Sequence, residues 1–313
     1  MIYKNTLISG ASGDIGIGVG RILKSEGFPV VYGCDVNTDS WGVCVFGSIR
    51  YLPSADSPEY INALATLIDE LGIELFIPTS EAELLRLSSI SSSLISQVGC
   101  DVLMVCDDII ELSLDKLKTV EFLNKNNIKA PWTLESEGAI PVSYPFISKP
   151  RRGRGSRDVE IVTSEQRAFE LNKNSGHVFQ EYLLPESQEY TCGVFRSKSG
   201  EIRSININRT LQGGFTDKGT VVENRDIDRY IEQIVQSMNL EGAINLQLRL
   251  TESGPVLFEI NPRFSSTVVF RHKLGFQDLI WSIQDLYDEY QRGGYEKPAV
   301  GTTFYRGLAE YFV

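Results

Sequence analysis

Apolar and polar positions along the first third of the chain follow two alternating patterns. Short apolar runs predict strands at residues 5–9, 29–34, 73–78 and 102–106. Apolar residues at helical spacing predict helices at 16–26, at 58–71 and from Ala82 onward. Strands that alternate with helices are typical of a doubly wound parallel sheet. We therefore expect an α/β layer that ends near Asp108.

The pattern changes after about residue 110, where prolines separate shorter segments. A capped amphipathic helix is predicted at 113–126 and another helix at 225–238. Further strands are predicted at 146–149, 177–182, 190–196, 202–208, 243–250 and 256–260. The serine-rich residues 88–96 fit a helix and its turn. The chain is thus predicted to form two units.

Composition and charge exclude several classes of protein. The 313 residues carry a formal net charge of -11, which argues against a general nucleic-acid or anionic membrane surface. We find neither an apolar run of membrane-spanning length nor a secretory leader. The five cysteines contain no CxxC pair, and the two histidines lie far apart. We expect a cytoplasmic protein without a histidine-based zinc site or a Ser-His-Asp triad.

The sequence PFISKPRRGRGSRDV places Lys149 at a strand end, before a loop rich in glycine and arginine. Small residues let backbone N–H groups approach phosphate oxygens, and the lysine supplies a positive charge. The segment is not a Walker A loop, because GxxxxGK[ST] is absent. It suits a polyphosphate, although a basic surface hairpin explains the same residues equally well.

Two further segments carry carboxylates. In QEYL, Glu181 is followed by Glu189 a few residues later, so the pair could hold an adenine amino group and a ribose. An edge strand with solvated acids is the simpler interpretation.

In LFEINPRFSSTV, Glu259 and Asn261 alternate on a strand and share one face. Oxygen ligands there suit Mg²⁺, with Gln247 on the preceding strand.

Arg263 follows these oxygen ligands and is placed to meet a phosphoryl group. A polar cross-strand pair followed by an Asn-Pro turn is the alternative for this segment. It explains the Asn-Pro step well. It explains Glu259, inside an otherwise apolar strand, poorly.

Together these segments resemble the ATP-grasp superfamily, in its branch similar to the carbamoyl-phosphate synthase large chain. The resemblance covers about residues 1–275 and rests on SLDKLKTVEFLNKNNIKAP, FISKPRRGRGS, QEYLLPESQEYT, AINLQ and FEINPRFS. It implies a Rossmann-like layer at 1–110, followed by a two-lobed α+β ATP-grasp domain at 111–313. Its small, nucleotide-covering lobe would span roughly 130–183.

The resemblance also implies residue roles. The ATP-binding residues would be Lys149 at the α/β-phosphates, Gly153, Arg154, Gly155 and Ser156 in a mobile flap, Glu181, Tyr182 and Leu183 at the adenine, and Glu189 at the ribose. Lys116 or Lys118 would also reach the nucleotide, and family usage points to Lys116. Gln247, Glu259 and Asn261 would ligate Mg²⁺, with Mn²⁺ left open. Lys149 and Arg263 would be the catalytic residues.

The implied activity is that of an ADP-forming carboxylate–amine ligase. A carboxylate attacks the γ-phosphate to form an acyl phosphate, which an amine or ammonia then attacks. Some relatives have an arginine shortly after NPR, whereas Ser265 follows Phe264 here, so a larger acceptor than bicarbonate is easier to reconcile. The partners are small molecules, and a homodimer is left open. A catalytically silent ATP-binding protein is an alternative.

The opening segment GASGDIG favours a different function when taken alone. Gly10, Gly13 and Gly16 match a dinucleotide-binding loop, and Asp35 ends the second strand. An NAD(P)-dependent oxidoreductase is therefore a second alternative. No tyrosine precedes a lysine by four positions, however, so the dehydrogenase catalytic pair is missing.

In the ATP-grasp branch this loop would instead border the acceptor substrate. Candidate substrate contacts are Gly10, Ser12, Gly13, Glu81, Arg209, Arg225 and Ser265. Glu81 fits equally well as an acid in the first turn of a helix. The Gly-rich residues 207–226 could cover the acceptor, or form a solvated hairpin.

Overall fold

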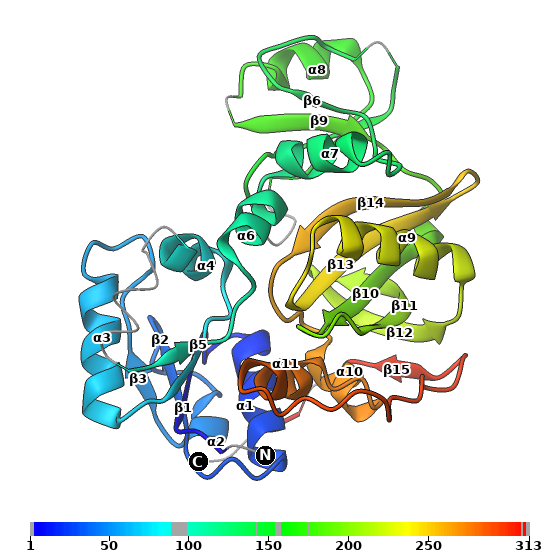
Figure 1. Ribbon diagram of the computed structural model, residues 1–313. Helices are drawn as coiled ribbons and strands as arrows, with labels where there is room; N and C mark the ends of the chain where they lie inside the picture. Colours follow the sequence, from blue (N-terminus) through cyan, green and yellow to red (C-terminus); the bar gives the residue numbers. More distant parts are fainter. Residues whose placement is uncertain are drawn as a thin grey trace.

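The computed structural model describes residues 3–88, 99–141, 143–153, 158–174, 176–307 and 309–310. Three β-sheets form in this part of the chain (Figure 1). A parallel sheet precedes two antiparallel sheets, which confirms the predicted α/β fold class. The helix and turn expected at 88–96 lie outside the described residues, apart from Ser88.

The first sheet is parallel, with strand order β3-β2-β1-β4-β5. Its strands are β1 (Thr6–Ser9), β2 (Val31–Asp35), β3 (Ile49–Tyr51), β4 (Leu75–Ile77) and β5 (Asp101–Val102). The connecting helices are α1 (Asp14–Ser25), α2 (Val43–Phe46), α3 (Tyr60–Leu71) and α4 (Glu81–Ser88). The strand expected at 102–106 is wrong beyond Val102. Val105, one of the apolar residues beyond this strand, is instead buried against residues of the third sheet.

The turn between β1 and α1 requires two of the glycines in GASGDIG. Gly10 has a φ of +63°, and a Cβ on it would lie 2.3 Å from Thr79 Oγ1. A Cβ on Gly16 would lie 2.2 Å from the carbonyl oxygen of Gly10. Both positions exclude a side chain, so these glycines allow the helix to pack closely on the strand.

Two helices connect the first sheet to the rest of the chain. They are α6 (Asp107–Leu114) and α7 (Lys116–Lys125), and Asp115 lies between them. The Asp115 side chain caps α7 by accepting hydrogen bonds from the backbone N–H groups of Leu117 and Lys118. The helix expected at 113–126 is confirmed over Lys116–Lys125, but its predicted start is wrong, because Asp115, in an extended conformation, ends one helix and begins the next.

The second sheet is antiparallel, has the order β6-β9-β7-β8 and lies at the top of Figure 1. Its strands are β6 (Thr133–Glu135), β7 (Phe146–Pro150), β8 (Glu160–Val162) and β9 (His177–Glu181). Helix α8 (Glu165–Leu171) covers one face. Its Ala168 and Leu171 pack in a small core with Phe146 and Phe179 of the sheet.

The third sheet is antiparallel, with the order β14-β13-β10-β11-β12-β15. Its strands are β10 (Glu189–Arg196), β11 (Ile202–Gln212), β12 (Phe215–Val222), β13 (Gly242–Thr251), β14 (Gly254–Asn261) and β15 (Thr303–Tyr305). The one-turn η1 (Glu186–Gln188) precedes it, and α9 (Arg225–Ser237) packs on it. The Gly-rich residues 207–226 largely form the β11–β12 hairpin, in which Gln212 pairs with Phe215.

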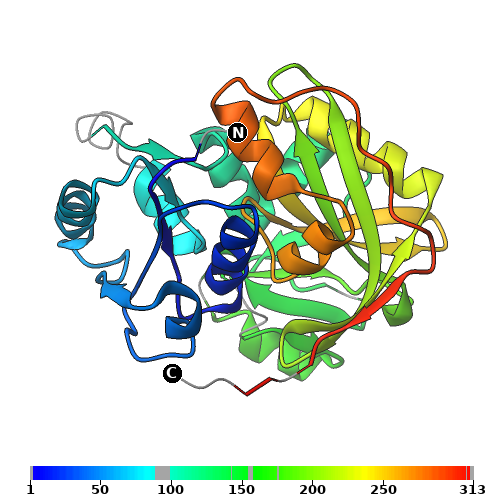
Figure 2. The same cartoon turned by 90° about the horizontal axis from the view of Figure 1, so that it is seen from below.

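Helices α10 (Val268–Lys273) and α11 (Asp278–Leu286) join the first sheet to the third. Figure 2 shows α1 beside these two helices. One hydrophobic core contains Val19 of α1, Val268 of α10, Leu279 of α11 and Phe195 of β10. The first sheet therefore has a fixed position relative to the third. No helix among the described residues is long and apolar enough to cross a membrane.

Candidate functional site

A cavity of about 460 Å³ lies between the second and third sheets and extends to the start of α1. Its wall contains thirteen of the residues predicted from the sequence: Lys116, Lys149, Gly153, Glu181, Tyr182, Leu183, Glu189, Arg209, Gln247, Glu259, Asn261, Arg263 and Ser265. Arg154, Gly155 and Ser156 lie outside the described residues. The fold thus brings segments that are far apart in the sequence to one cavity.

Lys149 is the most deeply buried cation of this wall, with 6% of its surface exposed. It lies on β7, and its Nζ donates a hydrogen bond to the backbone carbonyl of Phe258 on β14 at 3.2 Å. Burial lowers the pKa of Lys149 to about 7, an effect that Glu259 opposes and Lys116 reinforces. A lysine in this state would gain its charge when an anion enters the cavity.

Lys116 and Lys118 have different environments. Lys116 is 9% exposed, lines the cavity and donates a hydrogen bond from Nζ to the carbonyl of Gly153 at 3.2 Å. Lys118 points to the other side of α7 and forms an ion pair with Glu111 at 2.9 Å. Only Lys116 of this pair is therefore placed to contact a molecule in the cavity.

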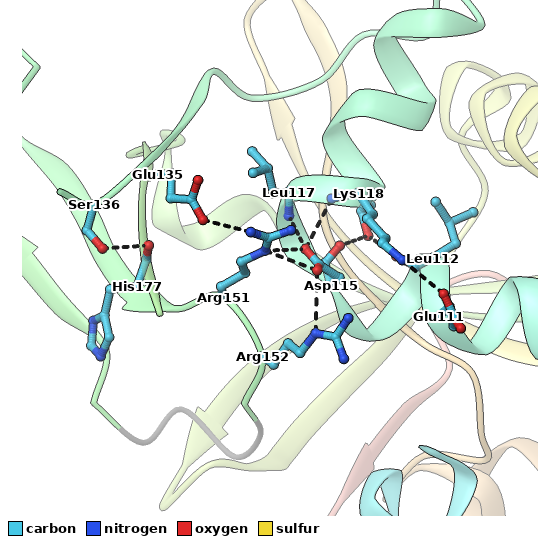
Figure 3. Close-up of polar contacts among 11 residues, drawn as sticks. Glu111, Leu112, Asp115, Leu117, Lys118, Glu135, Ser136, Arg151, Arg152 and His177 are labelled. Atoms are coloured by element: carbon cyan, nitrogen blue, oxygen red, sulfur yellow. Dashed lines mark hydrogen bonds and ion pairs between the residues drawn. The ribbon is translucent and has the colours of Figure 1, made fainter. Parts of the chain in front are cut away.

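Asp115, which is 1% exposed, connects α7 to the segment after β7 (Figure 3). Its carboxylate accepts hydrogen bonds from Arg151 Nε at 2.9 Å and from Arg152 Nε at 3.4 Å. Arg151 also pairs with Glu135 at 2.7 Å. Burial alone would raise the pKa of Asp115, but the Arg151 hydrogen bond and the backbone N–H of Lys118 hold it below its usual range. This carboxylate therefore fixes the base of the Gly153 loop.

The segment that connects the second sheet to the third forms one end of the cavity. The Glu181 carboxylate accepts a hydrogen bond from the backbone N–H of Trp132 at 3.3 Å. Gln180 is buried and donates to Thr133 Oγ1 at 3.0 Å. Leu183, together with Ile147 of β7 and Phe258 of β14, gives this end an apolar lining. An aromatic base could bind between these side chains.

Glu189 lies between two arginines on the third sheet. Its Oε1 accepts a hydrogen bond from Arg209 Nη2 at 2.9 Å, and its Oε2 accepts one from Arg249 Nη2 at 2.6 Å. Arg209 also donates to Gln247 Oε1 at 2.9 Å. Arg209 thus lines the cavity with its guanidinium already bonded to two protein groups, which makes it a poor candidate to bind a substrate carboxylate.

Glu259, Asn261 and Gln247 form an oxygen-rich patch on β13 and β14. Gln247 is the register partner of Glu259 across the two strands. The Glu259 carboxylate makes no hydrogen bond or ion pair with any described residue. Asn261 is 3% exposed, and its Nδ2 is buried without a partner among the described residues.

A divalent cation fits this patch. The described residues contain no group of three or more His, Cys, Asp or Glu that could hold a metal ion, so a cation would depend on amide oxygens and on phosphates as well as on Glu259. The Glu259 carboxylate and the Asn261 Oδ1 accept no hydrogen bond from a described side chain, so these oxygens are available to it, whereas the Asn261 Nδ2 is a donor and cannot ligate a cation. Gln247 fits less well, since its oxygen already accepts the Arg209 hydrogen bond.

Arg263 and Ser265 lie at the end of the cavity that faces the first sheet. Arg263 Nη2 forms an ion pair with Glu81 Oε1 at 2.8 Å. Ser265 is mostly buried, and its hydroxyl is 2.7 Å from Thr267 Oγ1. Glu81 does not line the cavity itself and contacts it only through Arg263.

Besides Glu81, four of the residues predicted as substrate contacts are not in the cavity wall. They are Gly10, Ser12, Gly13 and Arg225. Ser12 lies in the turn after β1, and its backbone N–H donates to Asp35 Oδ2 at 3.0 Å. Asp35 Oδ1 accepts a second hydrogen bond, from the N–H of Asn37. Asp35, the acid expected to bind a ribose, therefore uses both carboxylate oxygens to accept hydrogen bonds from the backbone. Arg225 is an exposed residue at the start of α9.

The cavity also contains residues that were not predicted as site residues. Asp14 and Ile15, the first residues of α1, form its wall next to Arg263 and Ser265. Arg249 belongs to the Glu189 network and donates to the Leu183 carbonyl at 2.5 Å. The position of Asp14 directly after the Gly13 turn is a signal in the sequence that could have identified it.

Comparison with known proteins assigns the middle of the chain to a protein family. Residues 113–267 match the family model described as an ATP-grasp domain. This region is an ATP-grasp domain. It contains every cavity residue named above except Asp14 and Ile15. The predicted resemblance to this superfamily is confirmed, and the curated relatives below confirm its branch.

The chain also has curated relatives at low identity. The chain is 25% identical over 208 residues to the carbamoyl phosphate synthase large chain of Thermoanaerobacter sp. (strain X514). This match covers 56% of this chain and 18% of the relative. The chain thus spans about a fifth of the length of that relative.

Two solved structures resemble the whole fold. The biotin carboxylase domain of Hydrogenobacter thermophilus 2-oxoglutarate carboxylase, solved with MgADP, ADP and bicarbonate, has a TM-score of 0.73 at 15% identity, covering 97% of this chain and 74% of that chain. The L-amino acid ligase of Bacillus licheniformis has a TM-score of 0.72 at 15% identity, covering 93% and 77%. At this identity the likeness establishes the fold alone.

Proposed function

We propose that this protein is an ATP- and Mg²⁺-dependent ligase that joins a carboxylate to an amine or to ammonia. The observation that carries the proposal is the set of groups that line one cavity. An apolar hinge end, the buried Lys149, the free carboxylate of Glu259 and Arg263, which contacts the first sheet, all belong to its wall. ATP, a cation and an acid would each find a matching group there.

The adenine would bind at the hinge, between Leu183, Ile147 and Phe258. Lys149 and Lys116 would contact the phosphates, the latter beside the Gly153 carbonyl. Glu189 would accept hydrogen bonds from ribose hydroxyl groups while it keeps its two arginines. The apolar lining and the buried lysine, taken together, support a nucleotide with a polyphosphate group.

Glu259 and Asn261 would hold Mg²⁺, which supplies positive charge to the phosphate oxygens during transfer. A Mn²⁺ ion could take the same oxygen ligands. Gln247 would join the ligands only after Arg209 releases its oxygen.

Arg263 would stabilise the negative charge of the γ-phosphoryl group and of the acyl phosphate. The acid attacks the γ-phosphorus, so a new oxygen–phosphorus bond forms and ADP leaves. The amine then attacks the acyl carbon, and phosphate leaves. The protein chiefly positions these reactants and neutralises their charge, so it needs no nucleophile of its own.

A screen for ADP release tests the proposal. Carboxylates would be crossed with amines, including ammonia, in the presence of ATP and Mg²⁺. We expect release that depends on both the acid and the amine, and that is lost in Lys149→Met and Glu259→Gln. ATP binding without turnover across the panel would favour the silent ATP-binding alternative. Binding of NADH, with no binding of ATP, would favour the oxidoreductase.

A further inference from the structure

Asp14 has no role in the scheme above, although its carboxylate lines the cavity. It is the first residue of α1, and it lies at the end of the cavity that contains Arg263 and Ser265. Its Oδ2 is buried and accepts no hydrogen bond from a described residue, and its charged partner is Arg306, in a long ion pair of 3.9 Å to Nη1. A carboxylate oxygen without a hydrogen bond on a cavity wall requires an explanation.

The other carboxylates of the cavity wall already have partners or an assigned role. Glu181 accepts a hydrogen bond from the backbone of Trp132. Glu189 is held by two arginines. Glu259 is the group that we assign to the cation. Among the described residues of this wall, Asp14 is the carboxylate left for the second substrate.

We propose that Asp14 binds the protonated amine of the second substrate and takes a proton from it before the amine attacks the acyl phosphate. This inference rests on the proposed ligase function and specifies one of its substrates as a cationic amine. Asp14 would be a catalytic residue, because it touches the reacting nitrogen. Arg263 would hold the acyl phosphate at the same end of the cavity, within reach of that nitrogen.

The step balances in atoms and charge. An ammonium nitrogen has no lone pair, so one N–H bond must break before the C–N bond forms. That proton passes to Asp14 and then to solvent. The carbon–oxygen bond to the phosphoryl group breaks as the C–N bond forms. A second nitrogen proton ends on the released phosphate, and the third stays on the amide nitrogen.

The electrostatics of Asp14 suit this role. Burial raises its pKa above the usual range, and the nearby Arg306 and Arg263 only partly offset the effect. A carboxylate with a raised pKa is a better proton acceptor. Ile15, next to it in the chain, and Phe215 of the same cavity wall give the amine substituent an apolar surface.

The test compares two amines that differ in charge. Hydroxylamine is neutral at neutral pH and needs no base, whereas methylamine is protonated. The acid would be the carboxylate that gives the fastest hydroxamate formation with the wild-type enzyme. For Asp14→Asn we expect hydroxamate formation near the wild-type rate and a loss of about 100-fold or more in N-methylamide formation. Asp39→Asn makes the same chemical change at an exposed site and should leave both rates unchanged.

Each other outcome has a distinct meaning. Wild-type rates with both amines in Asp14→Asn would overturn the role of Asp14 and leave the ligase function standing. Loss of both products would also overturn it, since a base for the amine is not needed with hydroxylamine. No hydroxamate from any acid with the wild-type enzyme would overturn the proposed function itself.

A second measurement covers the case in which the variant does not fold. In the wild-type enzyme, the ratio of N-methylamide to hydroxamate should fall as the pH drops through the raised pKa of Asp14. Arg306 and Arg263, the charged groups that act on Asp14, keep their charge over this range. A ratio that follows only the protonation of the two amines in solution would contradict the proposal.

Discussion

Arg263 Nη2 donates a hydrogen bond to Glu81 Oε1 at 2.8 Å, which joins the ATP-grasp domain to the first sheet. Arg263 follows β14, and Glu81 begins α4. Both side chains are largely buried, at 15% and 12% exposed. The first sheet therefore orients the arginine that we assign to the acyl phosphate, although Glu81 itself does not line the cavity.

The Glu81 carboxylate should matter through this arginine. In Glu81→Gln the charge is lost and the size is kept, so Arg263 is held less firmly. We expect kcat for ADP release to fall about tenfold, with the Kd for ATP unchanged. Kinetics and calorimetry on the same preparation would show the separation. Glu59→Gln, an exposed acid at the start of α3, should change neither. A weaker Kd for ATP with an unchanged kcat would argue against this role.

The carboxylates of Asp115 and Glu111, both drawn in Figure 3, should contribute unequally to stability. Asp115→Asn weakens the α7 cap and leaves Arg151 and Arg152 without their acceptor charge. We expect a loss of about 1–3 kcal/mol in the free energy of unfolding. Glu111→Gln removes the exposed partner of Lys118 and should cost less than about 1 kcal/mol. Urea unfolding of both variants measures the difference, and equal losses would contradict it.

The lowered pKa of Asp115 sets the pH window of its contribution. A carboxyl with a lower pKa in the folded state stabilises the fold fully above its unfolded pKa, and the contribution is lost as the pH falls through the folded pKa. The difference in unfolding free energy between wild type and Asp115→Asn should therefore be constant near neutral pH. It should shrink in acid. A difference that grew in acid would show that another group dominates.

Lys149 should take up a proton when a nucleotide binds. Its pKa is about 7 in the cavity, because burial disfavours the charge, and phosphate oxygens would raise it. At about pH 8 we expect uptake of up to one proton per ADP, and affinity should fall as the pH rises further. Calorimetry in two buffers with different ionisation enthalpies measures this uptake. Equal heats in both buffers would contradict the assignment of Lys149 to the phosphates.

Arg271 and Asp278 form a buried ion pair at 2.8 Å, and neither of them lines the cavity. Both side chains are 1% exposed. Asp278→Asn leaves a buried cation unpaired, so we expect a loss of about 3–5 kcal/mol in the free energy of unfolding. Asp226→Asn, which removes the partner of exposed Arg229, should change stability little. A small effect of Asp278→Asn on thermal unfolding would contradict the prediction.

The sequence predicts those parts of the site that depend on local geometry. Glu259 and Asn261 share a face because side chains alternate along a strand. Lys149 could be placed because it ends a strand before a glycine-rich loop. The α/β layer followed from the alternation of strands and helices, and the cap of α7 could have been read from Asp115 in place of Ser113.

Long-range partners could not be read from the sequence in the same way. Arg209 pairs with Glu189 because β10 and β11 are neighbours in the third sheet. The spacing of the two residues in the sequence does not predict that these strands pair. Glu81 reaches Arg263 only because α10 and α11 fix the first sheet against the third. The sequence alone assigns no role to Asp14, because the glycines around it match a dinucleotide-binding loop.

The fate of the acid's oxygen tests the central claim most directly. If an acyl phosphate forms, a carboxylate labelled with a heavy oxygen isotope transfers one labelled oxygen to the released phosphate and keeps the other in the amide. Mass spectrometry of the phosphate, after turnover with ATP, Mg²⁺ and an active acid and amine, should show one labelled oxygen per molecule. Unlabelled phosphate released at the rate of ADP formation would contradict the ligase mechanism.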